Sequence, residues 1–370
     1  MTVKNNILHL MGMDSTKYGG IERFNVELSR QLAAKGYHSV FVYESLPAVS
    51  QFVEDIQSTG GEIAIIKSRG NALGFCKQFW RLLHLYDFCM MHAHFTKARF
   101  YAIPLALLYG LKNIIYTFHS RVPPKREMKI HTRMWYNVFN RYCRIVAVSK
   151  DIENVSRLNW PKAVIRNIYL GIEPGKPDRA QARKEMGIAD DMLMVMCTAN
   201  YNQVKGLDIL AQSVAELKQY TDLSKVAFYI VGQPEEDKAE MQQLIEELQV
   251  SSYFHLEGIS NKIPQYLNAA DIYVQPSRSE GLPLSLMEAC SVGLPIVASR
   301  IGGIPEVAVD GENAMLFDVE NIDECAHALH RILTDSSLRK GLGENSKRVY
   351  EEKFQLSNNV NKLIEYYDLE

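Results

Sequence analysis

The chain has 370 residues, of which 47% are hydrophobic and 23% charged, with a net charge of −2. That length exceeds one ordinary hydrophobic core and predicts two domains. The near-neutral charge argues against a dedicated nucleic-acid-binding protein. No segment approaches the roughly 18 continuous apolar residues of a membrane helix, and the first residues do not resemble a signal peptide. Six scattered cysteines without a C-x-x-C pair indicate buried thiols, so we expect a cytoplasmic protein.

The first half of the chain alternates between short apolar runs and segments with helical periodicity. Such alternation predicts βαβ units, and therefore a mostly parallel sheet covered by helices. The pattern breaks into glycine and proline at 169–177, which we interpret as an interdomain linker. The predicted strands are 7–10, 39–43, 62–66, 88–93, 113–118 and 145–148, and the predicted helices are 21–34, 51–58, 74–85, 99–109 and 132–142.

A second alternating series follows the linker and predicts a second α/β domain. Beyond residue 333 the chain is expected to be helical, ending in 360–367. Two such domains facing one another would place the carboxyl ends of their strands across one cleft, where open α/β sheets bind ligands. The predicted elements are 192–197, 207–218, 226–231, 238–248, 253–256, 271–274, 285–291, 296–298, 315–317 and 322–333.

Glycines and histidines follow strands of the first domain. Gly19 and Gly20 open the first helix and allow a ligand close to the backbone, although such a pair is also a common turn. The fingerprint G-x-G-x-x-G is absent, which counts against a nicotinamide enzyme. His119 ends strand 113–118, where a lone histidine is also readily a buried, satisfied residue. His92 and His94 alternate along one strand, and the sequence shows no third metal ligand beside them.

The segment 121–144 interleaves cations and aromatic residues, with one acid, Glu127. This composition fits peripheral docking on anionic lipid or binding of a phosphorylated acceptor. It fits equally a solvated amphipathic helix whose aromatic side chains pack inward. The residues in question are Lys125, Arg126, Lys129, Arg133 and Arg141, with Trp135, Tyr136, Phe139 and Tyr142.

Two glutamates eight residues apart are the most informative feature of the second domain. Glu280 lies in the loop after strand 271–274, and Glu288 lies in the helix that follows. Exposed N–H groups and a positive dipole end are expected at the start of that helix. Such a site could bind a nucleotide sugar, with one carboxylate on the hydroxyls of the sugar, the other on those of the ribose, and backbone amides on the phosphates between them. The alternative is a pair of solvated surface residues, because charged side chains are mostly exposed.

The segment 277–306, with its E-x7-E spacing and the run Gly302-Gly303-Ile304-Pro305-Glu306, resembles the retaining glycosyltransferases of family 4, which have the GT-B fold. The resemblance implies two Rossmann-like domains facing across a cleft. Residues 1–172 would form the acceptor side and 173–352 the nucleotide-sugar-binding domain. Residues 353–370 would form a terminal helix that packs back on the first domain.

The resemblance also implies a role for individual residues. Glu280 would hold donor-sugar hydroxyls, Glu288 the ribose, and His119 hydroxyls near the reacting carbon. Lys205 would neutralise the pyrophosphate together with an arginine that the family usually has where Asn200 stands. This departure weakens leaving-group stabilisation, unless Arg23 or Arg278 compensates. Donor contacts are further implied for Gly19, Gly20, Ile259 and the backbone of Gly281, Leu282 and Leu284, and we place Glu22, His94 and Arg121 on the acceptor side.

The implied reaction moves a hexose or N-acetylhexosamine from a nucleoside diphosphate sugar, UDP rather than GDP, to a hydroxyl of a glycan, lipid-linked or polyol acceptor. The setting would be cell-surface polysaccharide or glycoconjugate biosynthesis. No D-x-D triplet occurs, which fits a mechanism without metal, and no cofactor is expected. Two alternatives remain open: a sugar-nucleotide epimerase of the same fold, and a catalytically weak binding subunit, to which Asn200 is the only pointer.

Overall fold

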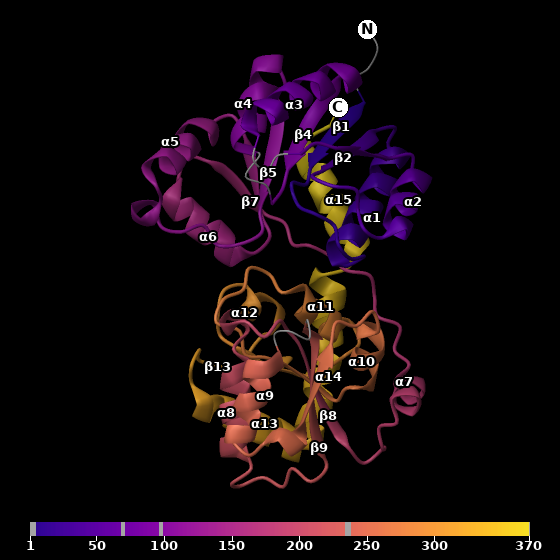
Figure 1. The fold of residues 1–370 in the computed structure, drawn as a ribbon, viewed down its shortest axis with the longest axis vertical. Helices are drawn as coiled ribbons and strands as arrows, with labels where there is room; N and C mark the ends of the chain where they lie inside the picture. The colour runs from indigo at the N-terminus through magenta and orange to yellow at the C-terminus, as the bar shows by residue number, and fades with distance from the viewer. Residues whose placement is uncertain (1–4, 68–70, 96–98, 234–237, 370) are drawn as a thin grey trace. The chain divides into compact units, whose positions relative to one another are not determined.

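The structure is a computed structural model that describes residues 5–67, 71–95, 99–233 and 238–369. The chain divides into two compact units, one of Met1–Glu173 with Leu356–Glu370, and one of Pro174–Gln355. Each unit is built on a single parallel sheet flanked by helices (Figure 1). The predicted α/β class with two Rossmann-like parts is therefore confirmed.

The sheet of the first unit has the strand order β3-β2-β1-β4-β5-β6-β7. The order runs outward in both directions from the neighbours β1 and β4, which makes the space between them a topological switch point. The strands are β1 (Asn6–Leu10), β2 (His38–Tyr43), β3 (Glu62–Ile65), β4 (Phe88–Ala93), β5 (Asn113–Phe118), β6 (Arg144–Ala147) and β7 (Val164–Asn167). The helices are α1 (Gly20–Ala34), α2 (Ser50–Ser58), α3 (Ala72–Tyr86), α4 (Arg99–Tyr109), α5 (Ile130–Phe139), α6 (Lys150–Asn159) and α15 (Leu356–Tyr367).

The second sheet has the order β10-β9-β8-β11-β12-β13, and its switch point lies between β8 and β11. Its strands are β8 (Leu193–Thr198), β9 (Val226–Gln233), β10 (Phe254–Gly258), β11 (Ile272–Gln275), β12 (Ile296–Ser299) and β13 (Ala314–Phe317). The helices of this unit are α7 (Arg179–Met186), α8 (Leu207–Leu217), α9 (Lys238–Glu247), α10 (Ile263–Ala269), α11 (Leu284–Ser291), α12 (Ile304–Val307), α13 (Ile322–Thr334) and α14 (Ser336–Lys353).

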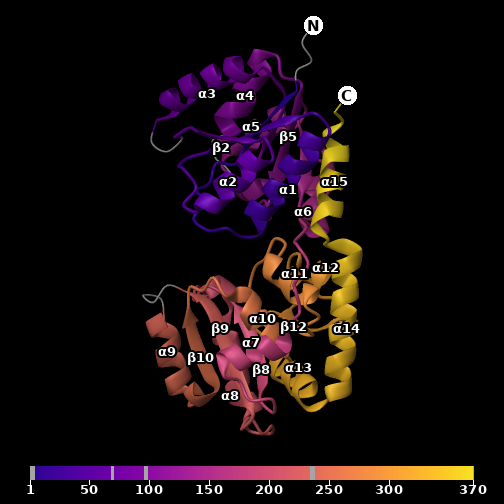
Figure 2. The ribbon, with the colours of Figure 1, turned by 90° about the vertical axis from the view of Figure 1, so that its right-hand side faces the viewer.

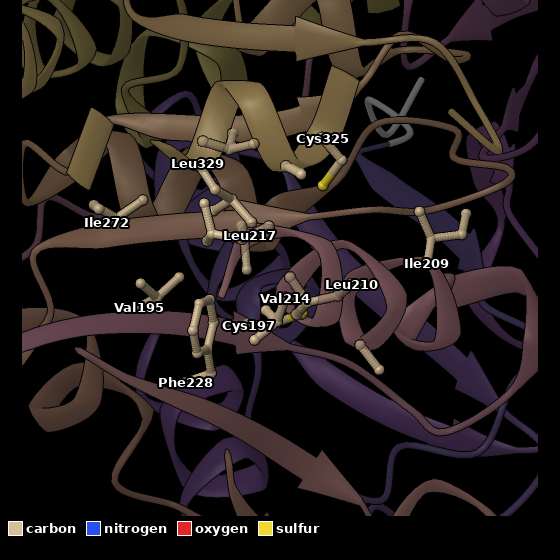
Figure 3. Close-up of a cluster of buried hydrophobic side chains, with 14 of the residues drawn as sticks. Val195, Cys197, Ile209, Leu210, Val214, Leu217, Phe228, Ile272, Cys325 and Leu329 are labelled. Carbon is tan, nitrogen blue, oxygen red and sulfur yellow. The ribbon is translucent and has the colours of Figure 1, made fainter. Parts of the chain in front are cut away.

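Both faces of the second sheet are buried: on β8, Met194 and Met196 point to one face, Val195 and Cys197 point to the other, and all four are buried. On one face Val195 and Cys197 of β8 pack with Phe228 of β9 (Figure 3). Leu210 and Val214 of α8 close this face. Strands buried on both faces read as continuous apolar runs rather than alternating ones, and this is why the sequence located them well.

The terminal helix α15 belongs to the first unit, as the resemblance implied. It lies alongside α1 (Figures 1 and 2). Its start is tied by the Leu356 amide, which donates to the Ile172 carbonyl at 3.0 Å. Its end is tied by Arg144, whose guanidinium donates to the Tyr366 carbonyl at 2.6 Å. No helix in the described part of the chain is both long and apolar enough to cross a bilayer.

Five helices and strands were not predicted: β7, α6, α7, α10 and α12. β7 is a four-residue edge strand in which only Ile165 is buried. In α7 the buried residues are Ala182 and Arg183, so a single small apolar side chain marks the inner face. Such elements carry too few apolar positions for periodicity to reveal them.

Candidate functional site

The loops after β8 and β11 meet at the switch point of the second unit. Lys205 ends a short 3-10 turn (Gln203–Lys205) in the first loop, and Glu280 lies in the second. The Lys205 ammonium donates to Glu280 Oε1 at 2.8 Å. The two side chains are 27% and 11% exposed. The sequence assigned both residues to one site, and the structure brings them into direct contact.

Two further donors hold the same oxygen of Glu280. Gln275 Nε2 and Ser277 Oγ each donate to Oε1 at 2.8 Å, and both residues are buried. Gln275 is itself oriented by Ser285 of α11, whose hydroxyl donates to its Oε1 at 3.1 Å. Among the described residues, the hydrogen bonds to the Glu280 carboxylate fall on Oε1 alone. The sequence reading missed Gln275 and Ser277, although the run Gln275-Pro276-Ser277 directly precedes the Glu280 loop.

Two glycines allow these loops to approach one another. At Gly206 (φ +64°) an added Cβ would lie 2.0 Å from the carbonyl oxygen of Pro276. At Gly302 (φ +55°) it would lie 2.0 Å from the carbonyl oxygen of Glu280. Both positions therefore combine left-handed backbone with contact too close for any side chain. Gly302 opens the motif that suggested the family, and here it sets the distance between the β12 loop and Glu280.

Arg278 fastens the turn that carries Lys205. Its backbone amide donates to the Val204 carbonyl at 2.7 Å, and its guanidinium contacts both oxygens of Asp208 at 2.7 Å. Glu320 binds the same guanidinium, and the two carboxylates raise the pKa of Arg278. The charge of Arg278 is therefore already paired with two carboxylates, and its contacts hold the turn in place. This does not favour Arg278 as a substitute for the arginine that the family usually has at position 200. Asn200 itself is exposed in the loop after β8.

Glu288 and the predicted backbone donors lie on or before α11. Gly281 and Leu282 precede Pro283, and Leu284 is the first helical residue. Because a helix leaves its first N–H groups without intrahelical partners, Leu284 offers a donor at a positive dipole end. Glu288 is half-buried on the second turn. Ile259, in the loop after β10, is 76% exposed.

In the first unit the glycine loop after β1 is held by Glu22. This glutamate is 4% exposed. One carboxylate oxygen accepts from the Gly19 amide at 3.0 Å and the other from the Ser15 hydroxyl at 2.9 Å. Glu22 therefore caps α1 and shapes the loop. Gly20 is the first residue of α1.

Histidines gather where β4 and β5 end. His94 Nδ1 lies 3.4 Å from His119 Nε2, and the His119 ring stacks on Phe95 with centroids 3.7 Å apart. Burial lowers the pKa of His94 to about 3 and lowers that of His119. Both rings are therefore neutral near pH 7, and each has one nitrogen that can donate a hydrogen bond and one that can accept.

A third imidazole, from His9 on β1, completes a cluster that the sequence did not reveal. Nitrogens of His9, His92 and His94 lie within 4.8 Å of one another. The sequence showed no third metal ligand beside His92 and His94, but in the structure His9 lies close enough to be one. His92, however, already bonds the hydroxyls of Tyr367 and Thr117, each at 2.7 Å. A metal ion would have to displace one of these hydroxyls.

Two other cations assigned to the site are paired with carboxylates. Arg121 contacts both oxygens of Asp151 on α6, with Nε donating to Oδ2 at 2.6 Å. Arg23 of α1 donates to Glu173 at 2.7 Å, and both side chains are about half exposed. These pairs place Arg121 and Arg23 at the surface of the first unit.

Comparison with known proteins identifies the family. The sequence model described as Glycosyltransferase Family 4 matches residues 18–176, and the one described as Glycosyl transferases group 1 matches 178–349. The N-acetyl-alpha-D-glucosaminyl L-malate synthase of Bacillus anthracis is 23% identical over 95% of this chain and 94% of its own length. The D-inositol 3-phosphate glycosyltransferase of Thermobifida fusca is 27% identical over 54% of this chain and 49% of its own.

Solved structures share the fold. Anabaena Alr3699/HepE in complex with UDP superposes with a TM-score of 0.83 at 19% identity, covering 98% of this chain and 99% of that one. A glycosyltransferase from Rickettsia africae gives the same TM-score at 17% identity over 98% of both chains. The chain therefore belongs to glycosyltransferase family 4 and is an enzyme of the GT-B type.

Proposed function

We propose that this glycosyltransferase moves a hexose or N-acetylhexosamine from a UDP-sugar to an acceptor hydroxyl with retention of anomeric configuration. The observation that carries the proposal is the contact of Lys205 with Glu280 at a switch point, beside the start of α11. A cation, helix N–H groups and a held carboxylate are what a sugar diphosphate requires. HepE structures with UDP and with UDP-glucose support the choice of donor.

In the proposed reaction, the bond between the anomeric carbon and the diphosphate oxygen breaks. The acceptor oxygen bonds to the same face of the sugar, and its proton passes to the departing phosphate oxygen. Negative charge grows on the leaving group, so its stabilisation is the main catalytic task. Lys205 and the N–H groups at the start of α11 supply it, and we propose that no metal is required. Asn200 adds a hydrogen-bond donor without charge.

Glu280 would bind hydroxyls of the donor sugar through Oε2. Its other oxygen already holds Lys205, Gln275 and Ser277, so the carboxylate cannot rotate freely. His119, neutral because of burial, would bind a hydroxyl near the reacting carbon, with His94 orienting its ring. The acceptor is a glycan, a lipid-linked saccharide or a polyol, in cell-surface polysaccharide or glycoconjugate biosynthesis.

The direct test is acceptor-dependent release of UDP. UDP-glucose and UDP-N-acetylglucosamine are incubated with acceptors that include L-malate and inositol phosphate, which the names of relatives suggest. We expect release only with an acceptor, unchanged by EDTA, and an α-linked product by NMR. UDP release without acceptor would indicate an epimerase-like reaction, and an untouched donor would indicate a binding subunit. An inverted product or loss of activity in EDTA would contradict the mechanism.

Glu288→Ala should weaken UDP binding about tenfold to a hundredfold, because a hydrogen bond to a charged acceptor is worth roughly 1.5–3 kcal/mol. Turnover at saturating donor should stay within about twofold. Titration calorimetry with UDP measures the first effect and steady-state kinetics the second. Glu344→Ala, on an exposed position of α14, is the control. A variant that binds UDP normally but turns over slowly would reverse the assigned role.

A further inference from the structure

The aromatic side chains of α5 face the interior of the first unit. Tyr136 is 3% exposed, and its ring packs on Trp160 with centroids 4.7 Å apart. Trp135 donates from Nε1 to the Phe100 carbonyl at 3.2 Å. The inward packing that sequence analysis left open is therefore observed for these two rings. They leave the outer face of α5 to other residues.

That outer face carries large apolar side chains. Ile130, Met134 and Val138 are 65%, 61% and 50% exposed, and their spacing of four residues puts them in one row. Tyr142, just beyond the helix, is 58% exposed. A surface helix ordinarily turns polar residues outward. A row of three aliphatic residues on the outer face therefore indicates a binding surface.

Cations flank the row. Lys129 and Arg133 each precede a member of it by one residue, and Arg141 precedes Tyr142. Their side chains make no ion pair with any residue that the structure describes. The only acid of the segment, Glu127, lies 3.6 Å from Arg126 and offsets that charge. Lys129 and Arg141 are exposed and Arg133 is half-buried. The outer face thus combines exposed apolar groups with positive charge that no carboxylate of the described residues neutralises.

We propose that the outer face of α5 (the helix is labelled in Figure 1) docks on an anionic lipid bilayer. The face is made of Ile130, Met134, Val138 and Tyr142 with Lys129, Arg133 and Arg141. The helix would lie in the plane of the interface, with its aliphatic row at the acyl boundary and its cations at the headgroups. A soluble phosphate group would bind the cations but would not contact the aliphatic row, so a bilayer explains both features of the face. Docking would bring the proposed transferase to acceptors anchored in the membrane, and this consequence rests on the proposed function.

Flotation of the tag-free protein with lipid vesicles tests the proposal. We expect binding to vesicles of phosphatidylcholine with 30% phosphatidylglycerol, weak binding to phosphatidylcholine alone, and a decrease with salt. Ile130→Ser, Met134→Ser and Val138→Ser combined should lower the partition coefficient at least about tenfold. Lys129→Gln, Arg133→Gln and Arg141→Gln combined should lower it roughly fivefold for each cation removed.

The matched control replaces three exposed residues elsewhere on the surface: Leu46→Ser, Leu73→Ser and Tyr220→Ser. It should bind vesicles as the unchanged protein does. Failure of the unchanged protein to bind anionic vesicles overturns the proposal, as does an equal loss in the control. Competition by millimolar phosphate with normal binding of the serine variant would instead indicate a phosphate site. Stabilisation by UDP, measured separately, shows whether the donor site is intact whatever the vesicles report.

Discussion

Lys205→Ala should lower kcat by about a hundredfold to a thousandfold, the loss typical when one preorganised stabiliser of transition-state charge is removed. Asn200 stands where the family usually has a second cation, and Arg278 is held by Asp208 and Glu320. In the proposed mechanism, Lys205 therefore stabilises more of the leaving-group charge than a lysine with a cationic neighbour would. The measurement is steady-state UDP release with saturating donor and acceptor.

Lys225→Ala is the matched control for this variant. Lys225 pairs with Asp191 at the same distance of 2.8 Å, but both side chains are exposed at the surface. Exposed pairs of this kind contribute little to stability, so kcat should not change. Similar losses in the two variants, or full activity of Lys205→Ala, would contradict the role assigned to Lys205.

Gly302→Ala should destabilise the second unit by about 3 kcal/mol or more, which lowers its melting temperature by roughly 6–12 °C. The new Cβ would stand 2.0 Å from the Glu280 carbonyl oxygen, and the residue has φ +55°. The loop that carries Glu280 would have to shift. Activity should therefore fall even well below the melting temperature, as thermal unfolding and kinetics on the same preparation would show.

Gly311→Ala separates backbone strain from the steric clash. Gly311 also has a positive φ, +74°, but an added Cβ would meet no atom within 4 Å. It should cost about 1 kcal/mol from the left-handed conformation alone and leave activity unchanged. If both variants melt at the same temperature, the contact between Gly302 and the Glu280 loop does not matter for folding.

The fold was predictable because most strands are continuous apolar runs between helices with a clear buried stripe. The elements that escaped prediction, such as β7 and α7, are short and bury one or two side chains each. Only the family resemblance predicted that α15 packs on the first unit. Its contacts run to residues nearly two hundred positions earlier, such as the hydrogen bond from Asn359 to the Leu170 carbonyl, and periodicity cannot report such pairing.

Family resemblance assigned Glu280 and Lys205 to the same candidate site, and the structure places the two side chains in contact, while their roles stay predictions. The contact between them depends on how closely two loops approach, which glycines and Arg278 determine in three dimensions. The role of Glu22 escaped sequence reasoning for a related reason, because a buried cap and an acceptor ligand have the same residue type. His9 gave no signal, since it lies inside a strand one position before a buried leucine.

The position of α15 also has a consequence for biosynthesis. The first unit buries Val360 and Leu363 of α15 against α1 and bonds Tyr367 to His92, yet all of Pro174–Gln355 separates these partners in the chain. A ribosome therefore completes the second unit before it delivers the last helix of the first. While translation continues, the part of α1 that α15 covers stays exposed. The second unit, contiguous in sequence, can fold as soon as it emerges.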